Sequence, residues 1–157
     1  MDKIIGIGEY TISNDINDVI KTYALSSCVA LTAYDPIKNV LGMVHIALPN
    51  SGIMQNGVVE NPAYYADTAL PLLINKMCIG YGCIKAELEI RLFGGADSVR
   101  KDDVFNIGKR NLKMIESILQ QMKLKSCYSD SGGHLSRSIK ADVATGTVKV
   151  VFQPLNV

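Results

Sequence analysis

The sequence has almost no net charge and no long hydrophobic run, and each shortage excludes a class of protein. Sixteen Lys and Arg against 15 Asp and Glu leave a net charge of +1 over 157 residues. A net charge this small creates no overall electrostatic field that would attract nucleic acid or an anionic membrane. No basic cluster is interleaved with aromatic residues, so we expect no nucleic-acid partner. No apolar run approaches the roughly 18 residues of a membrane span, so we expect no membrane insertion.

Metal ligands are scarce as well. The chain has two histidines and four cysteines, and no two cysteines have the CxxC spacing of a zinc site. We therefore expect no metal and no other cofactor. The first residues lack the basic region and apolar core of a secretory signal, so we expect a reduced, cytoplasmic protein. Four cysteines still permit disulfide bonds, and the sequence alone leaves that question open.

The residues that are present predict one α+β domain over positions 1–157. Helical spacing predicts helices over 61–77 and 106–122, and residues 53–60 have no period and read as a loop. Asn61 and Pro62 resemble a helix cap and first turn, and Pro71 is expected to kink that helix near Asp67. Short apolar or alternating runs predict strands over 3–7, 10–13, 19–24, 28–34, 40–48, 86–93, 125–129, 136–142 and 147–152.

Cys28 and His45 are the first candidates for chemistry. Each lies in an apolar run, and a short turn sequence separates the two runs. If the runs are neighbouring strands, a thiol lies beside an imidazole. A cysteine with an adjacent base is the smallest set of groups that can support thiolate catalysis. The alternative is that Cys28 is a small core residue, as most cysteines in apolar strands are.

Three smaller patterns permit more than one interpretation. The glycine pairs at 94–95 and 132–133 allow either close backbone approach to a substrate or ordinary tight turns, and they gain functional weight only if both lie near Cys28. His134 follows the second pair and is expected in a loop. Asp67 and Thr68 are candidates for polar contacts to the loop after His45.

The chain also carries a series of motifs in a recognisable order. They are Ile5-Gly6-Ile7-Gly8-Glu9-Tyr10, Leu25-Ser26-Ser27-Cys28-Val29-Ala30, Asp35-Pro36, Gly42-Met43-Val44-His45, Leu48-Pro49-Asn50-Ser51, Tyr65-Ala66-Asp67-Thr68-Ala69, Phe93-Gly94-Gly95-Ala96, Asn106-Ile107-Gly108-Lys109-Arg110-Asn111, and Gly132-Gly133 with Arg137. Together they cover almost the whole chain, which resembles CheD, the family of bacterial chemoreceptor glutamine deamidases.

That resemblance implies a layered α/β sandwich with mixed or antiparallel β-sheets and two principal helices. It implies Cys28 as nucleophile, His45 as base and Thr22 as the residue that orients the imidazole. Backbone N–H groups near Ser26, Ser27 and Cys28 are the candidates to bind the substrate oxyanion. Family members convert glutamines on the cytoplasmic helices of chemoreceptors to glutamates, hydrolyse receptor methyl esters, and bind CheC, a response-regulator phosphatase.

One departure from the family pattern supports a competing hypothesis. The family usually has glycine at the position of Ser26, and serine would be strained there if the loop required a positive φ. Ala24 also stands where some relatives carry glycine. A chain with impaired catalysis would act mainly as a binding regulator of a CheC-type phosphatase. The third possibility is an unrelated α+β domain in which Cys28 is merely part of the core.

Overall fold

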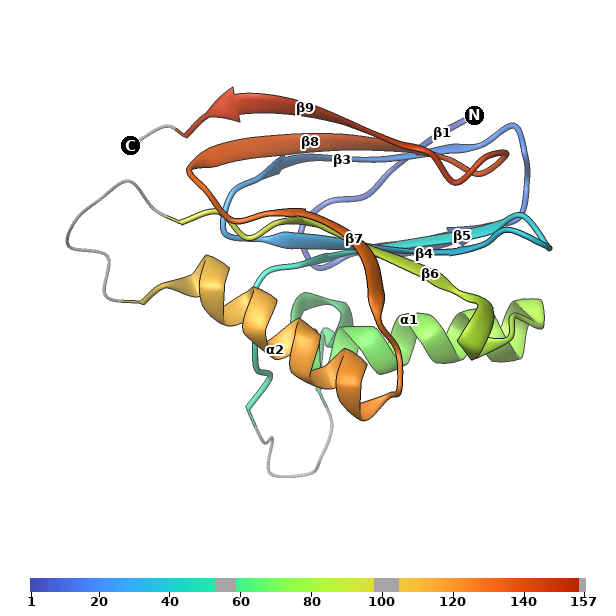
Figure 1. Cartoon of the computed structure of the whole chain (residues 1–157), viewed down its shortest axis with the longest axis horizontal. Helices are drawn as coiled ribbons and strands as arrows, with labels where there is room; N and C mark the ends of the chain where they lie inside the picture. The colour runs from blue at the N-terminus through green and yellow to red at the C-terminus, as the bar shows by residue number, and fades with distance from the viewer. Residues whose placement is uncertain (53–58, 98–104, 156–157) are drawn as a thin grey trace.

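The computed structural model describes residues 1–52, 59–97 and 105–155, and these form three layers (Figure 1). An outer four-stranded sheet lies on one side, a five-stranded sheet lies in the middle, and two long helices cover the far face of the five-stranded sheet (Figure 1). The predicted α+β sandwich with two principal helices is confirmed. No helix in the described ranges is both long enough and apolar enough to cross a bilayer.

Both sheets draw their strands from distant parts of the chain. The outer sheet has the order β1 (Asp2–Ile4), β3 (Val19–Leu25), β8 (Leu135–Asp142) and β9 (Val148–Pro154). The inner sheet has the order β2 (Tyr10–Ser13), β5 (Val40–Ile46), β4 (Val29–Asp35), β6 (Glu89–Gly94) and β7 (Ser126–Ser131). The β1–β3 and β6–β7 pairs are parallel and the other pairs are antiparallel, so both sheets are mixed.

Strands β4 and β5 are buried along their whole length because the inner sheet has a layer on each side. One hydrophobic core lies between this sheet and the helices and includes Leu31, Leu73 and Ile115. A second core lies between the two sheets and includes Ala30 and Met43. Alternate residues of β4 and β5 therefore face two different environments.

The first helix begins later than the sequence predicts. Asn61 makes no side-chain cap, and Pro62 opens a 3-10 turn, η1 (Pro62–Tyr64). Tyr65 is extended and bridges to Leu48, so the α-helix α1 (Ala66–Tyr81) begins only after it. An Asn-Pro pair suits the start of either kind of helix, and the bridge to Leu48 interrupts the helix at Tyr65. Helix α1 continues through Pro71 as one element.

Other predicted boundaries shift by a few residues. The predicted strand 86–93 is shortened by a 3-10 turn, η2 (Lys85–Glu87). The predicted strand 28–34 begins one residue later, which leaves Cys28 in the segment before β4. The second helix, α2 (Ile107–Gln121), agrees closely with its prediction. Of the predicted loop 53–60, residues 53–58 lie outside the described residues.

An irregularity in β3 decides which of its side chains face the second core. The register with β8 shifts between Thr22 and Leu25, and Ala24 has a φ of 57°. This bulge lets both Thr22 and Leu25 point inward although their positions differ by three, an odd number, along the strand. Among the described residues, the positive φ near this loop falls on Ala24 and not on Ser26, so the strain considered for Ser26 is absent.

Candidate active site

The side chains of Cys28 and His45 lie on the same face of the inner sheet. His45 is paired with Ala30 across the β4–β5 ladder, and Ala30 belongs to the core between the sheets. Cys28 precedes Ala30 by two residues and packs against the same core. Its side chain therefore lies on the same side of the inner sheet as that of Ala30, the ladder partner of His45. The structure thus places the thiol and the imidazole between the two sheets.

Thr22 reaches His45 from the opposite sheet. Its Oγ1 lies 2.7 Å from His45 Nδ1 and donates a hydrogen bond to the Ile5 carbonyl at 2.9 Å. The single hydroxyl proton is used on Ile5, so the Thr22 oxygen must accept from Nδ1–H. This fixes the imidazole tautomer and leaves Nε2 with a free lone pair. Within the described residues His45 Nε2 is buried and has no hydrogen-bond partner.

Burial keeps the thiol and the imidazole neutral. It lowers the pKa of His45 to about 4, since the ring is 2% exposed. Burial also raises the pKa of the half-buried Cys28 thiol. No hydrogen bond joins Cys28 Sγ to His45 in the described part of the chain. Burial therefore favours a neutral thiol beside a neutral base over a thiolate–imidazolium pair.

The segment before β4 is anchored through its backbone carbonyls. Gly95 N–H donates to the Cys28 carbonyl at 2.8 Å, and Ala96 N–H donates to the Ser26 carbonyl at 2.7 Å. Gly94 has a φ of 106°, and a Cβ atom there would overlap the Cys28 carbonyl oxygen. This first glycine pair therefore serves the Cys28 segment directly.

The second glycine pair supports the first. Gly132 N–H donates to the Gly94 carbonyl at 2.9 Å, and the Gly133 carbonyl accepts from Asp97 N–H at 2.8 Å. The first pair therefore contacts the Cys28 segment, whereas the second pair reaches that segment only through Gly94. His134 lies in the turn after this pair and is exposed, as the loop prediction expected.

The hydrogen bonds that hold this segment use its carbonyl groups and leave two of its backbone N–H groups available to a substrate. Among the described residues, neither the Ser27 N–H nor the Cys28 N–H donates to a protein acceptor. An oxyanion site needs such preorganised donors next to the nucleophile. Ser26 contributes its carbonyl to the anchoring, and no contact of its side chain points to substrate binding.

Sequence reasoning missed Asn111 as a member of this site. Its amide Nδ2 donates to the Ser27 carbonyl at 2.9 Å and to the Ala47 carbonyl at 3.0 Å. Asn111 is fully buried on α2, four residues after Ile107 and four before Ile115. A polar amide on the apolar stripe of an amphipathic helix was the signal that could have found it.

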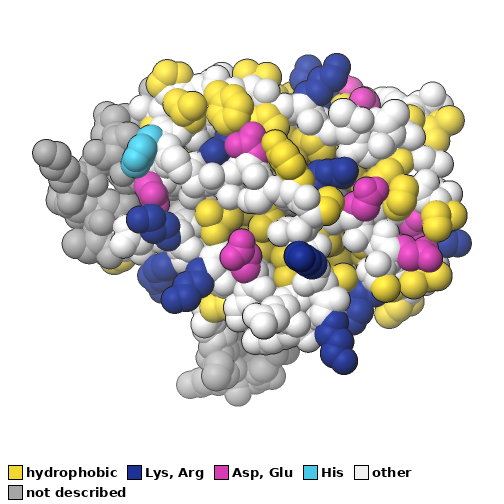
Figure 2. All heavy atoms as spheres, in the orientation of Figure 1, with side chains coloured by type: hydrophobic (Ala, Val, Ile, Leu, Met, Phe, Trp, Pro, Cys, Tyr) yellow, Lys and Arg dark blue, Asp and Glu magenta, His cyan; other side chains and the backbone are white. Residues whose placement is uncertain are grey.

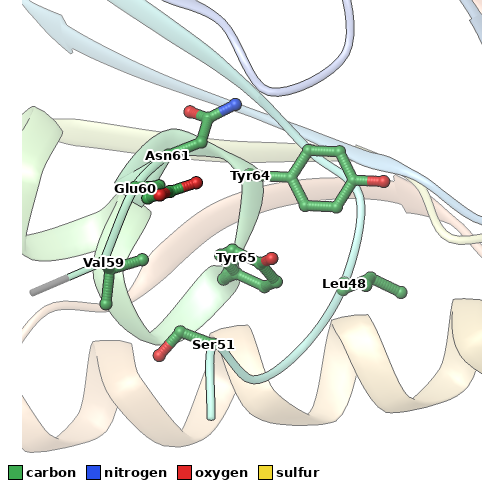
Figure 3. A pocket seen from close by; sticks show the side chains of 7 residues that line it. All are labelled: Leu48, Ser51, Val59, Glu60, Asn61, Tyr64 and Tyr65. Atoms are coloured by element: carbon green, nitrogen blue, oxygen red, sulfur yellow. The ribbon is translucent and has the colours of Figure 1, made fainter. Parts of the chain in front are cut away.

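A hollow lies beyond the carboxyl end of β5, the strand that carries His45. Figure 3 shows the side chains that line it, which are Leu48, Ser51, Val59, Glu60, Asn61, Tyr64 and Tyr65. Ser51 is held by Asp67, whose carboxylate accepts from the Ser51 N–H at 3.0 Å and from its hydroxyl at 2.9 Å. This confirms the expected polar contact between Asp67 and the loop after His45. Thr68 instead donates to the Pro62 carbonyl.

Cys78, Cys83 and Cys127 are free, like Cys28. On the face shown in Figure 2, basic and acidic side chains are interspersed, and apolar side chains lie between them. That face carries no broad surface of one sign.

Comparison with known proteins identifies close relatives. The model of a family described as "CheD chemotactic sensory transduction" matches residues 47–151. A Syntrophotalea carbinolica protein named "Probable chemoreceptor glutamine deamidase CheD" is 40% identical over 151 residues, which cover 95% of this chain and 93% of that protein. A Thermotoga maritima protein named "Chemoreceptor glutamine deamidase CheD" is 37% identical over 150 residues, with 96% and 91% covered.

Proposed function

Because the chain belongs to the CheD family of chemotaxis proteins, we propose that it hydrolyses glutamine side chains of chemoreceptors to glutamate. Cys28 is the nucleophile, His45 is the general base and acid, and Thr22 orients the imidazole. The observation that carries this proposal is the buried Nε2 lone pair of His45, free because Thr22 holds Nδ1. The Cys28 side chain packs against the core between the two sheets, where Thr22 contacts the His45 ring.

The first half of the reaction forms a thioester. As Cys28 sulfur attacks the carboxamide carbon, the thiol proton moves to His45 Nε2. Proton transfer coupled to attack suits a site in which burial favours the neutral forms of both groups. The Ser27 and Cys28 N–H groups donate to the developing oxyanion. The imidazolium then protonates the departing nitrogen, the C–N bond breaks, and ammonia leaves.

The second half regenerates the enzyme. His45 Nε2 takes a proton from water as the water oxygen attacks the thioester carbonyl. The C–S bond breaks, the imidazolium returns its proton to sulfur, and glutamate is released. A receptor glutamate methyl ester enters the same route, with methanol leaving in place of ammonia. No step uses a metal or an organic cofactor.

The competing hypothesis, a regulator of a CheC-type phosphatase with impaired catalysis, loses its main motivation. That motivation was strain at Ser26, and the positive φ falls instead on Ala24, an alanine in the bulge of β3 two residues earlier. A complex with such a phosphatase remains a compatible second role, because receptor modification and phosphatase binding do not exclude each other. Co-elution of the two purified proteins in size-exclusion chromatography tests it, and separate elution at micromolar concentration argues against it.

The test of the enzymatic proposal is a deamidation assay on a receptor signalling domain. Peptide mass spectrometry counts the glutamines converted to glutamate by the wild type, Cys28→Ala, His45→Ala and Thr22→Val. We expect no conversion by the first two variants. Thr22→Val should lower kcat by about 10-fold or more because the imidazole loses its tautomer control. Conversion by Cys28→Ala at the wild-type rate would remove the proposed nucleophile.

A further inference from the structure

The ladder between β4 and β5 includes His45 but ends one residue short of Cys28. Its last pair at this end is Val29 with Ile46. Cys28 lies just outside the ladder, and among the described residues its segment makes no backbone hydrogen bond to the chain after Ile46. The position of the Cys28 segment therefore depends on contacts from other elements.

Asn111 provides that connection from the helical layer. Its Nδ2 donates at 2.9 Å to the carbonyl of Ser27, the residue before the nucleophile. The same nitrogen donates at 3.0 Å to the carbonyl of Ala47, two residues after His45. One fully buried amide therefore bridges the start of β4 and the end of β5.

The bridge also completes the anchoring of the segment. The carbonyls of Ser26 and Cys28 bind the N–H groups of Ala96 and Gly95, and Asn111 binds the Ser27 carbonyl between them. Three consecutive carbonyls are thus held by the protein, while the Ser27 and Cys28 N–H groups find no acceptor among the described residues. Loss of the Asn111 contact would free the peptide plane that joins Ser27 to Cys28 and carries the Cys28 N–H.

The amide oxygen of Asn111 indicates that packing alone does not explain why an asparagine occupies this position. Within the described chain, Asn111 Oδ1 is buried and has no hydrogen-bond partner. A buried acceptor without a partner is unfavourable, and an apolar residue at this helix position would avoid it. Unlike an apolar residue, Asn111 donates two hydrogen bonds, to the Ser27 and Ala47 carbonyls.

We propose that Asn111 is a positioning residue for the deamidation reaction, fixing the Cys28 N–H donor and the spacing between Cys28 and His45. The inference rests on the proposed function and deepens it. Asn111 touches no reacting atom and acts through the Ser27 and Ala47 carbonyls.

Two substitutions and a matched control test this role. Asn111→Leu removes both donors and keeps an apolar side chain of similar size. Asn111→Asp provides a donor only while its carboxyl group is protonated. Ile115→Ala is the control, because Ile115 is fully buried one turn later on the same helix but contacts neither catalytic segment through hydrogen bonds. All assays are run well below the melting temperature of each variant.

We expect Asn111→Leu to lower kcat by about 100-fold with little change in KM, as small misplacements of catalytic groups do. Asn111→Asp should recover activity relative to wild type as the pH falls. Ile115→Ala should melt earlier but keep its kcat. A folded Asn111→Leu protein with kcat close to wild type would overturn the proposal, and so would equal losses in Asn111→Leu and Ile115→Ala.

A second readout is independent of the receptor assay. Iodoacetamide labelling of Cys28, followed on its own peptide by mass spectrometry, reports the local order of the segment. We expect Asn111→Leu to label about fivefold faster or more, and Ile115→Ala to label like wild type. Equal rates for Asn111→Leu and wild type would refute the positioning role even if no receptor is deamidated. Absence of deamidation by the wild type would instead refute the proposed function.

Discussion

At the residue scale, the environment of His45 determines how the site works. The ring lies between two sheets, Thr22 fixes its tautomer, and burial lowers its pKa to about 4. A histidine with this pKa is neutral at all pH values where most proteins work, so the base form is always available. The same burial makes protonation of His45 unfavourable in the folded state, which links the site to the stability of the whole chain.

The folded protein should lose stability in acid because of His45. The unfolded chain binds a proton at this side chain below a pKa of about 6.5, whereas the folded chain does so only below about 4. Between these values the unfolded state binds more protons, so the free energy of unfolding falls as the pH falls. Through His45 alone, the free energy of unfolding should be about 3 kcal/mol lower at pH 4 than at pH 7.

Urea denaturation of wild type and His45→Asn at pH 7 and pH 4 measures this contribution. Other titrating groups are shared by the two proteins, so the difference between their pH dependences isolates His45. The wild type should lose about 3 kcal/mol more than the variant. Identical pH dependences would mean that His45 is hydrated and that the site is more open than described.

Residue roles were harder to predict from the sequence than residue positions. The apolar runs suggested that Cys28 and His45 are neighbours, but the role of Thr22 came only from the family resemblance. Nothing in the run around Thr22 indicates that its hydroxyl crosses to another sheet. Asn111 was missed because its two acceptors are backbone carbonyls, which have no signature in a sequence.

At the scale of elements, the contact between the end of β6 and the Cys28 segment determines where Cys28 lies. Gly94 ends β6 with a φ of 106°, and its missing side chain leaves room for the Cys28 carbonyl. Gly95 and Ala96 then bind the carbonyls on either side of Ser27. The position of Cys28 is therefore set by a strand end that lies more than 60 residues further along the chain.

Gly94→Ala should disrupt both stability and catalysis. The new side chain would adopt a φ disfavoured for alanine and would collide with the Cys28 carbonyl, at a cost of at least about 2–3 kcal/mol. Gly132→Ala is the matched control, because Gly132 has a φ of 77° but open space around its missing side chain. It should cost only about 1 kcal/mol.

Denaturant midpoints and deamidation rates of the two variants decide this point. Gly94→Ala should have the lower midpoint, and its folded fraction should deamidate at least about 10-fold more slowly than wild type. Gly132→Ala should retain most of its activity. If the two variants were equally stable and equally active, Gly94 would be an ordinary turn glycine.

Element boundaries followed from the sequence where a local pattern decides them. The apolar stripe predicted α2 almost to the residue, and the buried runs predicted β4 and β5. The start of α1 was wrong because the extended conformation of Tyr65 depends on its bridge to Leu48. The bulge at Ala24 was also unpredicted, since it serves the pairing of β3 with a strand more than 100 residues away.

At the scale of the whole molecule, the three-layer arrangement explains why a thiol and an imidazole meet in a dry environment. The inner sheet supplies Cys28 and His45, the outer sheet supplies Thr22, and the helical layer supplies Asn111 (Figure 1). Each layer contributes at least one group. The division of the nine strands in the described residues into two sheets was not predictable, because it depends on long-range pairings such as β3 with β8.

The most direct test of the central claim is to trap the covalent intermediate. Wild-type protein and a receptor signalling domain are mixed, quenched in acid during the first turnover, and measured by intact mass spectrometry. The account predicts an adduct whose mass equals the two chains less ammonia, mapped to Cys28, sensitive to hydroxylamine and absent from Cys28→Ala. Glutamate formation at the full rate by Cys28→Ala, or an adduct on another residue, would contradict it.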